Sequence, residues 1–233
     1  MADQKYTHLL FDLDHTLWDY DKNAAETLTE LYQEFELEEK GNFSSEQLVE
    51  VFFEINEQLW SSYNIGQISK HAIRTQRFKK IFDQLGLPLQ HFPVDFDYRY
   101  VHGCPEKTHT MKYAKEMLDY LLPKYKMHII TNGFNDVQSV KLEKSGLGQY
   151  FDQVITSESC GAKKPSERIF DYTLEKIDAE KNECIMIGDN LNTDIQGAIN
   201  ANIDQVYFNP TGKSHNHEVT WEISCLSDLK KLF

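Results

Sequence analysis

The sequence predicts an α/β fold in which a parallel sheet carries helices on both faces and a helical unit interrupts the chain after the first strand. Three observations support this prediction. From residue 101 onward, short apolar runs alternate with segments of helical periodicity, which is typical of repeated βα units. A similar apolar run, THLLFD, stands far upstream at residues 7–12. Between the two lies a long stretch with helical periodicity alone.

The first predicted strand covers residues 7–12, because this run is apolar but too short for a helix. The segment that follows is different in kind. From residue 21 to residue 60 it holds 11 acidic and 2 basic residues, with apolar residues at helical spacing among them. The helical pattern continues until Gly86 and Pro88 stop it. We therefore assign residues 18–100 to a mostly helical, acid-faced unit.

The remainder of the chain alternates strands and helices, and we assign residues 1–17 and 101–233 to one α/β domain. Further strands are predicted at residues 127–131, 153–157, 183–188 and 204–208. Helices are predicted around Met111 to Leu121 and at residues 135–145, 166–176 and 191–200.

The charge balance restricts the partners. With 24 basic and 37 acidic residues the formal net charge is −13, so we expect neither a nucleic-acid polymer nor a membrane as partner. Such a chain can still bind a small anion in one local cationic pocket. The four cysteines show no metal-binding spacing, and neither a signal peptide nor a bilayer-spanning apolar run is visible. We expect a cytoplasmic protein, whose oligomeric state the sequence does not reveal.

Polar residues follow several predicted strands at the ends where parallel α/β sheets bind ligands. These residues are Asp12 and Asp14, then Thr131, Asn132 and Gly133, and finally Asp189 and Asp194, with the segment Lys163-Lys164-Pro165 before the last strand of the set. Four carboxylates gathered in one place would repel one another unless a cation lay among them. Hard oxygen ligands of this kind favour magnesium.

The motifs DLDHT at residues 12–16, TNG at 131–133, KKP at 163–165 and GDNLNTD at 188–194 resemble the four signature motifs of the haloacid dehalogenase-like hydrolase superfamily. Each motif alone also fits an ordinary turn, loop or surface pair, but four in order are a specific signal. The resemblance implies a Rossmann-like parallel core with an inserted helical cap. It also implies a magnesium-dependent phosphate monoester hydrolase.

The same resemblance implies a role for each catalytic residue. Asp12 would be the nucleophile and would form an aspartyl-phosphate. Asp14 would protonate the leaving oxygen and later take a proton from water, for which we expect a raised pKa. Thr131, the amide of Asn132 and Lys164 would hold the phosphoryl oxygens.

For the metal, the resemblance implies a site made from the same motifs. Magnesium would be bound by the carboxylate of Asp12, the backbone carbonyl of Asp14 and Asp189. Asp194 would bind the ion directly, bind it through water, or contact the ligands without contacting the ion.

The substrate is expected to be a small-molecule phosphate ester, and a nucleoside 5′-monophosphate is the preferred prediction. Residues 59–68 and 141–176 resemble segments of bacterial nucleotidases that act on pyrimidine nucleoside monophosphates. Trp18 and Tyr20, just past the first motif, are the residues expected to meet the substrate, with stacking on a base as one role. Packing in a hinge is the alternative role for both.

Other functions remain open from the sequence. A phosphatase for phosphoglycolate or a sugar phosphate would use the same motifs, and a phosphomutase shares all four. A haloacid dehalogenase attacks carbon and needs neither magnesium nor a second acid, so the presence of Asp14 argues against it. A binding module without catalysis is disfavoured because every motif position that takes part in the chemistry holds a suitable residue.

Overall fold

The computed structural model describes residues 5–233, so residues 1–4 of the first predicted domain segment lie outside the described residues. The chain divides into two compact units. One contains the chain up to Tyr20 together with Thr108–Phe233, and the other is Asp21–Lys107. These boundaries lie three residues beyond the expected end at 17 and seven beyond the expected end at 100. The second unit is thus a single insertion into the first.

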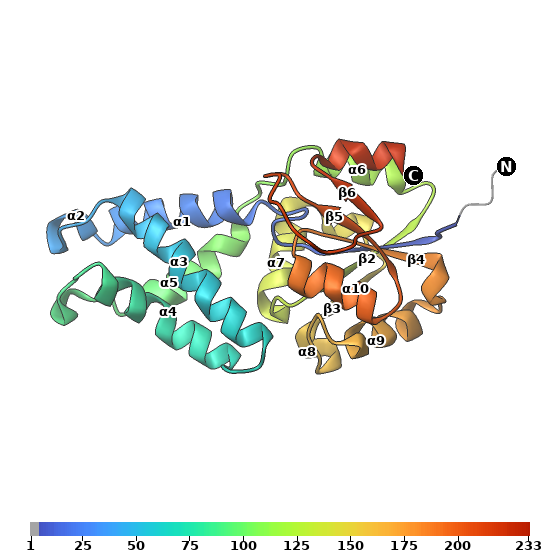
Figure 1. Cartoon of the computed structure of the whole chain (residues 1–233). Helices are drawn as coiled ribbons and strands as arrows, with labels where there is room; N and C mark the ends of the chain where they lie inside the picture. The colour runs from blue at the N-terminus through green and yellow to red at the C-terminus, as the bar shows by residue number, and fades with distance from the viewer. Residues whose placement is uncertain (1–4) are drawn as a thin grey trace. The chain divides into compact units, whose positions relative to one another are not determined.

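Among the described residues, the sheet of the first unit has six strands in the order β3-β2-β1-β4-β5-β6 (Figure 1). All neighbours pair in parallel. The strands are β1 (His8–Phe11), β2 (Lys126–Thr131), β3 (Gln153–Thr156), β4 (Cys184–Gly188), β5 (Asp204–Phe208) and β6 (Trp221–Ile223). The predicted α/β fold with a parallel sheet is confirmed, and the first five strands match the prediction to within one residue at each end.

The strands are joined by helices. They are α6 (Ala114–Leu121), α7 (Asn135–Ser145), α8 (Ser157–Cys160), α9 (Glu167–Ile177), α10 (Gln196–Asn200) and the short 3₁₀ turns η3 (Gly148–Tyr150), η4 (Lys181–Glu183) and η6 (Leu226–Lys231). One predicted helix, at residues 191–200, is instead a π-helix, η5 (Leu191–Ile195), that continues into α10. π-helical turns are frequent at functional sites, and this one follows β4 closely.

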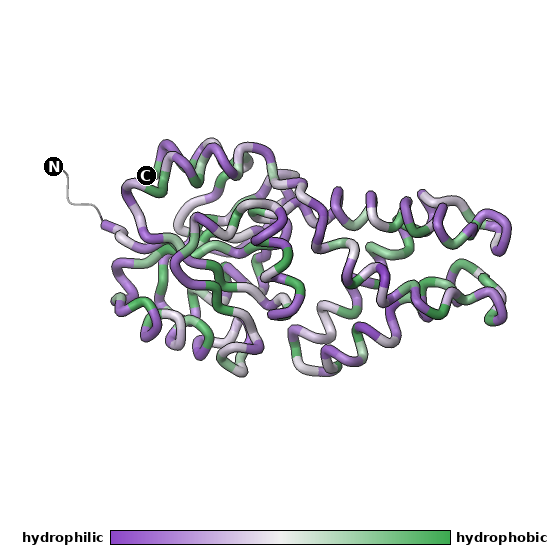
Figure 2. Tube along the Cα trace, turned by 180° about the vertical axis from the view of Figure 1, so that it is seen from behind, coloured by the Kyte–Doolittle hydropathy of each residue, from purple (hydrophilic) through white to green (hydrophobic). Residues whose placement is uncertain are grey.

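Both faces of the sheet are covered. Because side chains alternate along a strand, Leu10 of β1 points to one face and Leu9 and Phe11 to the other. On the face of Leu10, α9 and α10 contribute to one apolar cluster with Ile130 and Met186. Figure 1 shows α9 and α10 below the sheet and α6 with the C-terminal η6 above it. In Figure 2 the hydrophobic colour runs along the strands between these layers.

The chain leaves and re-enters the first unit along two paired segments. The backbone N–H of Asp19 donates to the carbonyl of His109 (3.1 Å), and that of Met111 donates to the carbonyl of Leu17 (2.9 Å). Upstream, residues 13–18 form a tight loop in which His15 has a left-handed backbone, with φ 63°. Leu17 and Asp19, which follow the first motif, are therefore held by backbone hydrogen bonds to the segment that returns from the second unit.

The second unit is helical. Its elements are α1 (Tyr20–Glu34, whose first residue belongs to the first unit), α2 (Leu37–Lys40), α3 (Ser45–Asn64), α4 (Lys70–Gln84), α5 (Phe96–Gly103), η1 (Leu89–His91) and η2 (Cys104–Glu106). Ser44 caps α3 in a capping box with Gln47, in which each side chain accepts from the other residue's backbone N–H. After α4, Gly86 takes a left-handed φ of 70°, which ends that helix as predicted.

The core of the second unit is aromatic and encloses one arginine. The rings of Phe78 and Tyr100 are 5.2 Å apart, and Phe52 lies 5.0 Å from Tyr100. The guanidinium of Arg77, which is 5% exposed, lies 4.6 Å from the Tyr100 ring centroid and 5.0 Å from that of Phe78. Asp97 pairs with the same guanidinium at 3.4 Å. Burial of this cation is therefore balanced by ring faces and one carboxylate.

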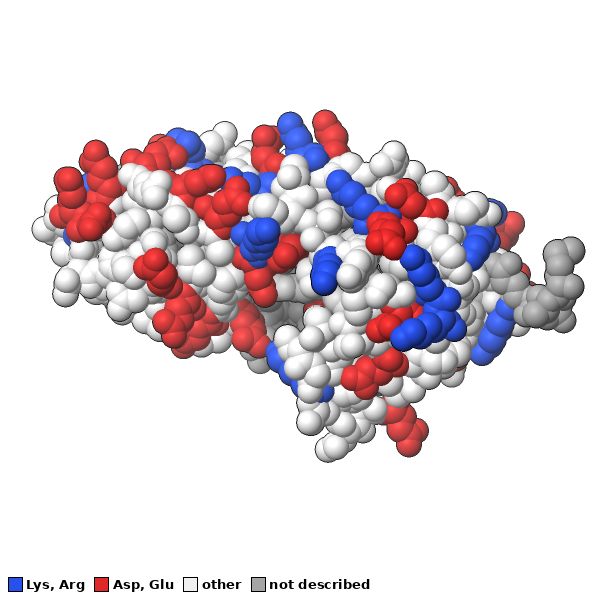
Figure 3. Space-filling view, turned by 90° about the horizontal axis from the view of Figure 1, so that it is seen from above, with Lys and Arg blue, Asp and Glu red and all other residues white. Residues whose placement is uncertain are grey.

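The surface follows the composition. On the face drawn in Figure 3, acidic side chains cover much of the helical unit, in keeping with the acidic run between residues 21 and 60. Within residues 5–233, no helix has both the length and the apolar character needed to cross a bilayer.

Candidate active site

The carboxyl ends of three neighbouring strands bring the predicted motifs together. β1 lies between β2 and β4 in the sheet. Asp12 follows β1 directly, Thr131 is the last residue of β2, and Asp189 follows the last residue of β4. Parallel α/β sheets bind their ligands at this edge, so the three motifs share one candidate site.

Asp12, Asp189 and Asp194 form a compact acidic cluster, in which one carboxylate oxygen from each lies within 4.8 Å of the others. The ammonium of Lys164 joins it, 2.5 Å from Oδ1 of Asp12 and 2.7 Å from Oδ1 of Asp194. Its third acceptor is the carbonyl of Ile130, at 2.6 Å. Lys164 is only 1% exposed, so the lysine next to the proline of the KKP motif is the one inside the site.

The cluster carries more negative than positive charge. Burial, with Asp194 and Asp189 close by, raises the pKa of Asp12 well above its usual range in spite of Lys164. Burial and Asp194 likewise raise the pKa of Asp189 to about 7. Three ionised carboxylates beside one ammonium would leave two negative charges uncompensated. The donors are hard oxygens and the excess matches a divalent cation, so these residues fit such an ion.

Asp194 is fixed by its own segment. Its Oδ2 accepts from the backbone N–H of Asn190 (3.0 Å), and its Oδ1 accepts from the hydroxyl of Thr193 (3.2 Å). A Cβ at Gly188 would lie 2.4 Å from Oδ2 of Asp194, so only glycine leaves room for the carboxylate there. Asp194 is therefore buried in the cluster, which sets it apart from an acid that merely favours a helix N-terminus.

Thr131 and Asn132 contribute in different ways. Both ends of the Asn132 side-chain amide bind the backbone of Lys164, at 2.8 Å to its N–H and 2.9 Å to its carbonyl. This side chain therefore positions Lys164. The hydroxyl oxygen of Thr131 accepts from the N–H of Gly133 (3.0 Å) and from Nε2 of Gln138 (2.8 Å). With both lone pairs occupied, the Thr131 hydroxyl hydrogen is left to donate elsewhere.

Asp14 lies outside the acidic cluster. Its Oδ1 accepts from Nζ of Lys141 (2.6 Å), and its Oδ2 accepts from Nε2 of Gln138 (2.9 Å). The expectation that four carboxylates gather is therefore wrong for Asp14. Burial acts to raise the pKa of this carboxyl, but Lys141 and Gln138 hold the pKa below its ordinary value. The expected raised pKa is also wrong, because a lysine that the motifs do not include faces Asp14.

Trp18 and Tyr20 have different surroundings. Trp18 has no exposed surface, and Nζ of Lys141 lies 4.5 Å from its ring centroid. In this structure the indole thus has no free face for a substrate base, contrary to expectation. Tyr20 is partly exposed, and its ring lies 5.0 Å from that of His15.

Three residues without a predicted role in the site also touch it. They are Thr16, whose hydroxyl donates to Asp189 at 2.8 Å, and Gln138 and Lys141 on α7. A signal for the last two is present in the sequence, since they share one helix face with apolar Leu142 and that face has few other apolar residues. Polar residues on the face that packs inward are a reason to look for a buried partner.

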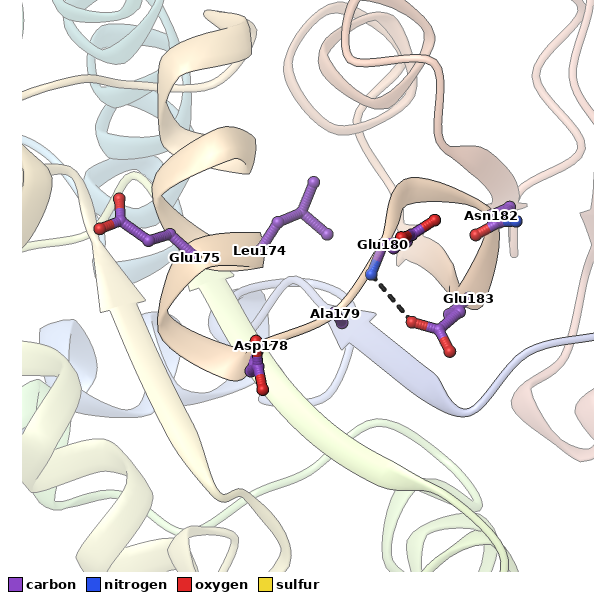
Figure 4. A pocket seen from close by; sticks show the side chains of 7 residues that line it. All are labelled: Leu174, Glu175, Asp178, Ala179, Glu180, Asn182 and Glu183. Atoms are coloured by element: carbon purple, nitrogen blue, oxygen red, sulfur yellow. Dashed lines mark hydrogen bonds between the residues drawn. The ribbon is translucent and has the colours of Figure 1, made fainter.

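A hollow lies at the other end of the sheet, between the end of α9 and the start of β4 (Figure 4). It has a volume of about 530 Å³, and its lining residues are Leu174, Glu175, Asp178, Ala179, Glu180, Asn182 and Glu183. Four of these are acidic and none is basic, so the hollow would repel a phosphate. It is therefore no candidate for the binding of an anionic substrate.

The chain is similar to known hydrolases over most of its length. Residues 6–202 match the family model of the haloacid dehalogenase-like hydrolases. The pyrimidine 5′-nucleotidase PynA of Streptococcus pneumoniae is 33% identical over 96% of this chain and 93% of its own. The pyrimidine 5′-nucleotidase YjjG of Escherichia coli is 30% identical over 98% of both chains. Among solved structures, the putative HAD-hydrolase YfnB of Bacillus subtilis bound to magnesium has a TM-score of 0.86 and 26% identity, with 98% of this chain and 99% of that one covered.

Proposed function

The chain belongs to the haloacid dehalogenase-like hydrolase family, and from this premise we propose that it hydrolyses phosphate monoesters with the help of magnesium, through a phosphoryl group carried on Asp12. One observation carries the proposal. At the carboxyl edge of the sheet, Asp12 lies in contact with a buried lysine and within 4.8 Å of two further carboxylates. A nucleophile, a cation and the ligands for a second cation thus stand together.

The acidic residues of the site would bind a divalent ion. We propose that the carboxylates of Asp12, Asp189 and Asp194 and the backbone carbonyl of Asp14 hold magnesium. When bound, the ion would offset the negative charge of the cluster and of the phosphoryl group. Whether Asp194 contacts the ion itself or through water does not alter this assignment.

The phosphoryl group would be bound by groups already oriented. The Thr131 hydroxyl has a hydrogen left to donate, and the Asn132 backbone N–H lies in the same turn after β2. Lys164 has three acceptors for its three hydrogens, so we propose that it exchanges one carboxylate for a phosphoryl oxygen. These donors would stabilise the charge of the phosphoryl oxygens during transfer.

The two aspartates of the first motif would act in sequence. An oxygen of Asp12 attacks phosphorus and the bond to the leaving oxygen breaks, while Asp14 gives a proton to that oxygen. Water then attacks the aspartyl-phosphate, Asp14 takes a proton from it, and phosphate leaves Asp12. Asp14 thus regains its proton, Asp12 is free again, and the phosphoryl group has passed from the ester to water.

For the substrate, we propose a nucleoside 5′-monophosphate with a pyrimidine base. The support comes from two relatives named as pyrimidine 5′-nucleotidases, at 33% and 30% identity over nearly the full chain. Tyr20 is the aromatic residue of the pair that has exposed surface for a base. Stacking of this kind contributes about 1–3 kcal/mol per base in other proteins. The inserted helical unit would serve as the cap of this family.

We further propose a cytoplasmic location. All four cysteines are free thiols. Two of them, Cys104 and Cys184, are fully buried and act as small apolar residues. Free thiols persist most readily in a reducing compartment, which supports this proposal.

The test measures kcat/KM for UMP, dTMP, AMP, phosphoglycolate and a hexose phosphate side by side. The proposal expects UMP and dTMP to exceed AMP, because a site that fits a pyrimidine excludes the larger purine. If a sugar phosphate or phosphoglycolate leads by about tenfold, about 1.4 kcal/mol, the nucleotidase assignment fails and the phosphatase assignment stands. Full activity after exhaustive chelation would instead favour the dehalogenase branch.

A further inference from the structure

Helix α7 places two polar side chains inside the molecule without a motif to explain them. Gln138 is 1% exposed and Lys141 is 4% exposed. They are three residues apart, so they lie on the same face of the helix. A buried ammonium is costly unless it has a partner of opposite charge. The partner in this structure is Asp14.

The two side chains donate hydrogen bonds to the two oxygens of one carboxylate. Nζ of Lys141 donates to Oδ1 of Asp14 at 2.6 Å, and Nε2 of Gln138 donates to Oδ2 at 2.9 Å. Hydrogen bonds to two different oxygens fix the rotation of the carboxylate as well as its position. A single contact would fix neither.

Gln138 also links Asp14 to the phosphate-binding turn. The second hydrogen of Nε2 goes to Oγ1 of Thr131, at 2.8 Å. The amide passes close to Gly133, where a Cβ would lie 2.2 Å from Nε2. Glycine at this position therefore leaves the space through which Gln138 reaches Asp14.

Lys141 is itself held in place. Its Nζ lies 4.5 Å from the ring centroid of Trp18 and 5.5 Å from that of Tyr20. Trp18 is fully buried, and cation–π contacts are strongest where water is excluded. The indole is thus a support for the lysine, which gives Trp18 a place in the site without contact to a substrate.

From these contacts we propose that Gln138 and Lys141 are positioning residues, which set the Asp14 carboxylate in line with the leaving oxygen; the proposal rests on the function proposed above. Asp14 stands on the loop after β1, and Gln138 and Lys141 on α7 donate to the two oxygens of its side chain. Displacement of a reacting group by about 1 Å can cost about a hundredfold in rate. Loss of either donor therefore affects mainly the step in which Asp14 takes part, and loss of Gln138 also removes one contact of the Thr131 hydroxyl.

The experiment compares Gln138→Leu and Lys141→Met with Lys144→Met, a matched change at an exposed position of the same helix. kcat/KM is measured for a nucleoside monophosphate and for p-nitrophenyl phosphate, because this ratio covers the leaving-group step and excludes the later hydrolysis of the aspartyl-phosphate. The nucleotide leaves as an alkoxide that needs a proton, whereas p-nitrophenolate does not. We expect losses of about tenfold or more for the nucleotide and less than about threefold for the aryl ester. Lys144→Met should change neither.

Two outcomes would overturn the proposal. Equal losses for both esters in folded variants would mean a structural role, and unchanged kcat/KM would mean no role. If the unmodified enzyme hydrolyses neither ester, the proposed function itself fails, whatever the variants do. Circular dichroism and Tm show which variants are folded.

A second variant tests the link independently of any change at α7. Gly133→Ala should push the Gln138 amide away from Asp14 and lower nucleotide turnover selectively. In a Gln138→Ala background, which also lacks Cγ and Cδ, the same alanine should have little further effect, because the atoms it displaces are gone. Additive losses in this double-mutant cycle would contradict the proposal.

Discussion

Two aspartates separated by one residue have opposite electrostatic surroundings. Asp12 shares Lys164 with Asp194, and burial among carboxylates raises its pKa well above the usual range. Asp14 is partly buried, but Lys141 faces it and its pKa is lowered. The surroundings, rather than the residue type, therefore separate the two carboxyl groups chemically. The roles proposed for the two residues need the opposite directions: a bound cation would lower the pKa of Asp12 and ionise the nucleophile, and Asp14 would act as an acid only after it takes up a proton.

Asp12→Asn should abolish turnover while leaving the fold intact. The amide cannot take up the phosphoryl group, and we expect kcat to fall by at least about a thousandfold. Because the change removes one of three mutually repelling carboxylates, the metal-free protein should melt no lower than the unmodified one. The measurement is steady-state turnover with Tm on the same samples. Appreciable residual activity would rule out Asp12 as the nucleophile.

The acidic residues of the site and Lys164 could be predicted, and the partners of Asp14 could not. Asp12 and Asp189 follow strands, and the ends of parallel strands meet at one edge whatever the loops do. Lys141, in contrast, lies 127 positions from Asp14 along the chain. Its role depends on how α7 rotates about its axis when it packs, and this rotation is set by tertiary contacts. The fully buried state of Trp18 depends on packing in the same way.

At the scale of elements, the strands that follow the hydrophobic pattern were predictable and the irregular pieces were not. The three central strands β1, β2 and β4 are buried at every residue except the first of β2, as expected for strands covered on both faces. β6 has only three residues, WEI, too few to show a period. The π-helix η5 has a helical composition, and its wider turn arises where Asp194 is drawn into the cluster.

The end of the sheet away from the site holds a buried histidine pair. His8 of β1 and His128 of β2 have stacked rings with centroids 5.3 Å apart, and Nδ1 of His8 lies 3.0 Å from Nε2 of His128. Burial, with His8 close by, lowers the pKa of His128 to about 4. One hydrogen shared between two neutral rings satisfies this contact, whereas a proton on both would not.

Stability should therefore fall in acid because of this pair. An unfolded histidine has a pKa near 6.5. Between about pH 6.5 and about pH 4, His128 therefore binds a proton in the unfolded chain but not in the folded chain. The contribution of this pair to the free energy of unfolding should decrease over this window as pH falls, by up to about 3 kcal/mol, and should be level above it. Urea unfolding of the unmodified protein and of His128→Phe measures the difference, which cancels the carboxylates common to both. His217→Gln, at an exposed position, should give a curve parallel to the unmodified one; a parallel curve for His128→Phe would refute the assignment.

Within the helical unit, Arg77 should be a strong determinant of stability. Arg77→Ala removes ring contacts with Phe78 and Tyr100 and leaves Asp97 without its cation. We expect the loss of about 3 kcal/mol in the free energy of unfolding that a broken buried pair typically causes. Lys80→Ala, at an exposed position of the same helix, should stay within about 0.5 kcal/mol. Comparable effects of the two changes in urea titrations would show that the arginine is not structural.

At the scale of the whole molecule, the net charge of the protein has the same sign as the charge of the proposed substrate. The chain has a formal net charge of −13, yet the proposed substrate is an anion. A phosphate would therefore be attracted only over a short range, by Lys164 and a bound cation, and repelled elsewhere. The acid-lined hollow below α9 has no such cation in its lining. The position of the positive charge thus selects one end of the sheet for the reaction.

Divalent metal should stabilise the folded protein through the acidic cluster. An ion that binds only the folded state adds about 2.7 kcal/mol at one hundred times its Kd, so Tm should rise with magnesium concentration and then level off. Asp189→Asn should melt no lower than the unmodified protein without metal, since repulsion in the cluster is relieved, and should lose most of the metal-induced rise. Thermal melts at fixed ionic strength give both quantities from the same samples.

A chain with this much negative charge also gains some stability from any cation, and the control must separate that effect from a site. Glu180→Gln removes one carboxylate from the acid-lined hollow at the far end of β4 and changes the net charge by the same amount as Asp189→Asn. Screening alone would make the two variants respond to magnesium alike, because both lose one negative charge. A site at the cluster requires that Glu180→Gln keep the full rise in Tm while Asp189→Asn loses it. Equal responses of the two variants would therefore contradict a metal site in the cluster and the role proposed for Asp189.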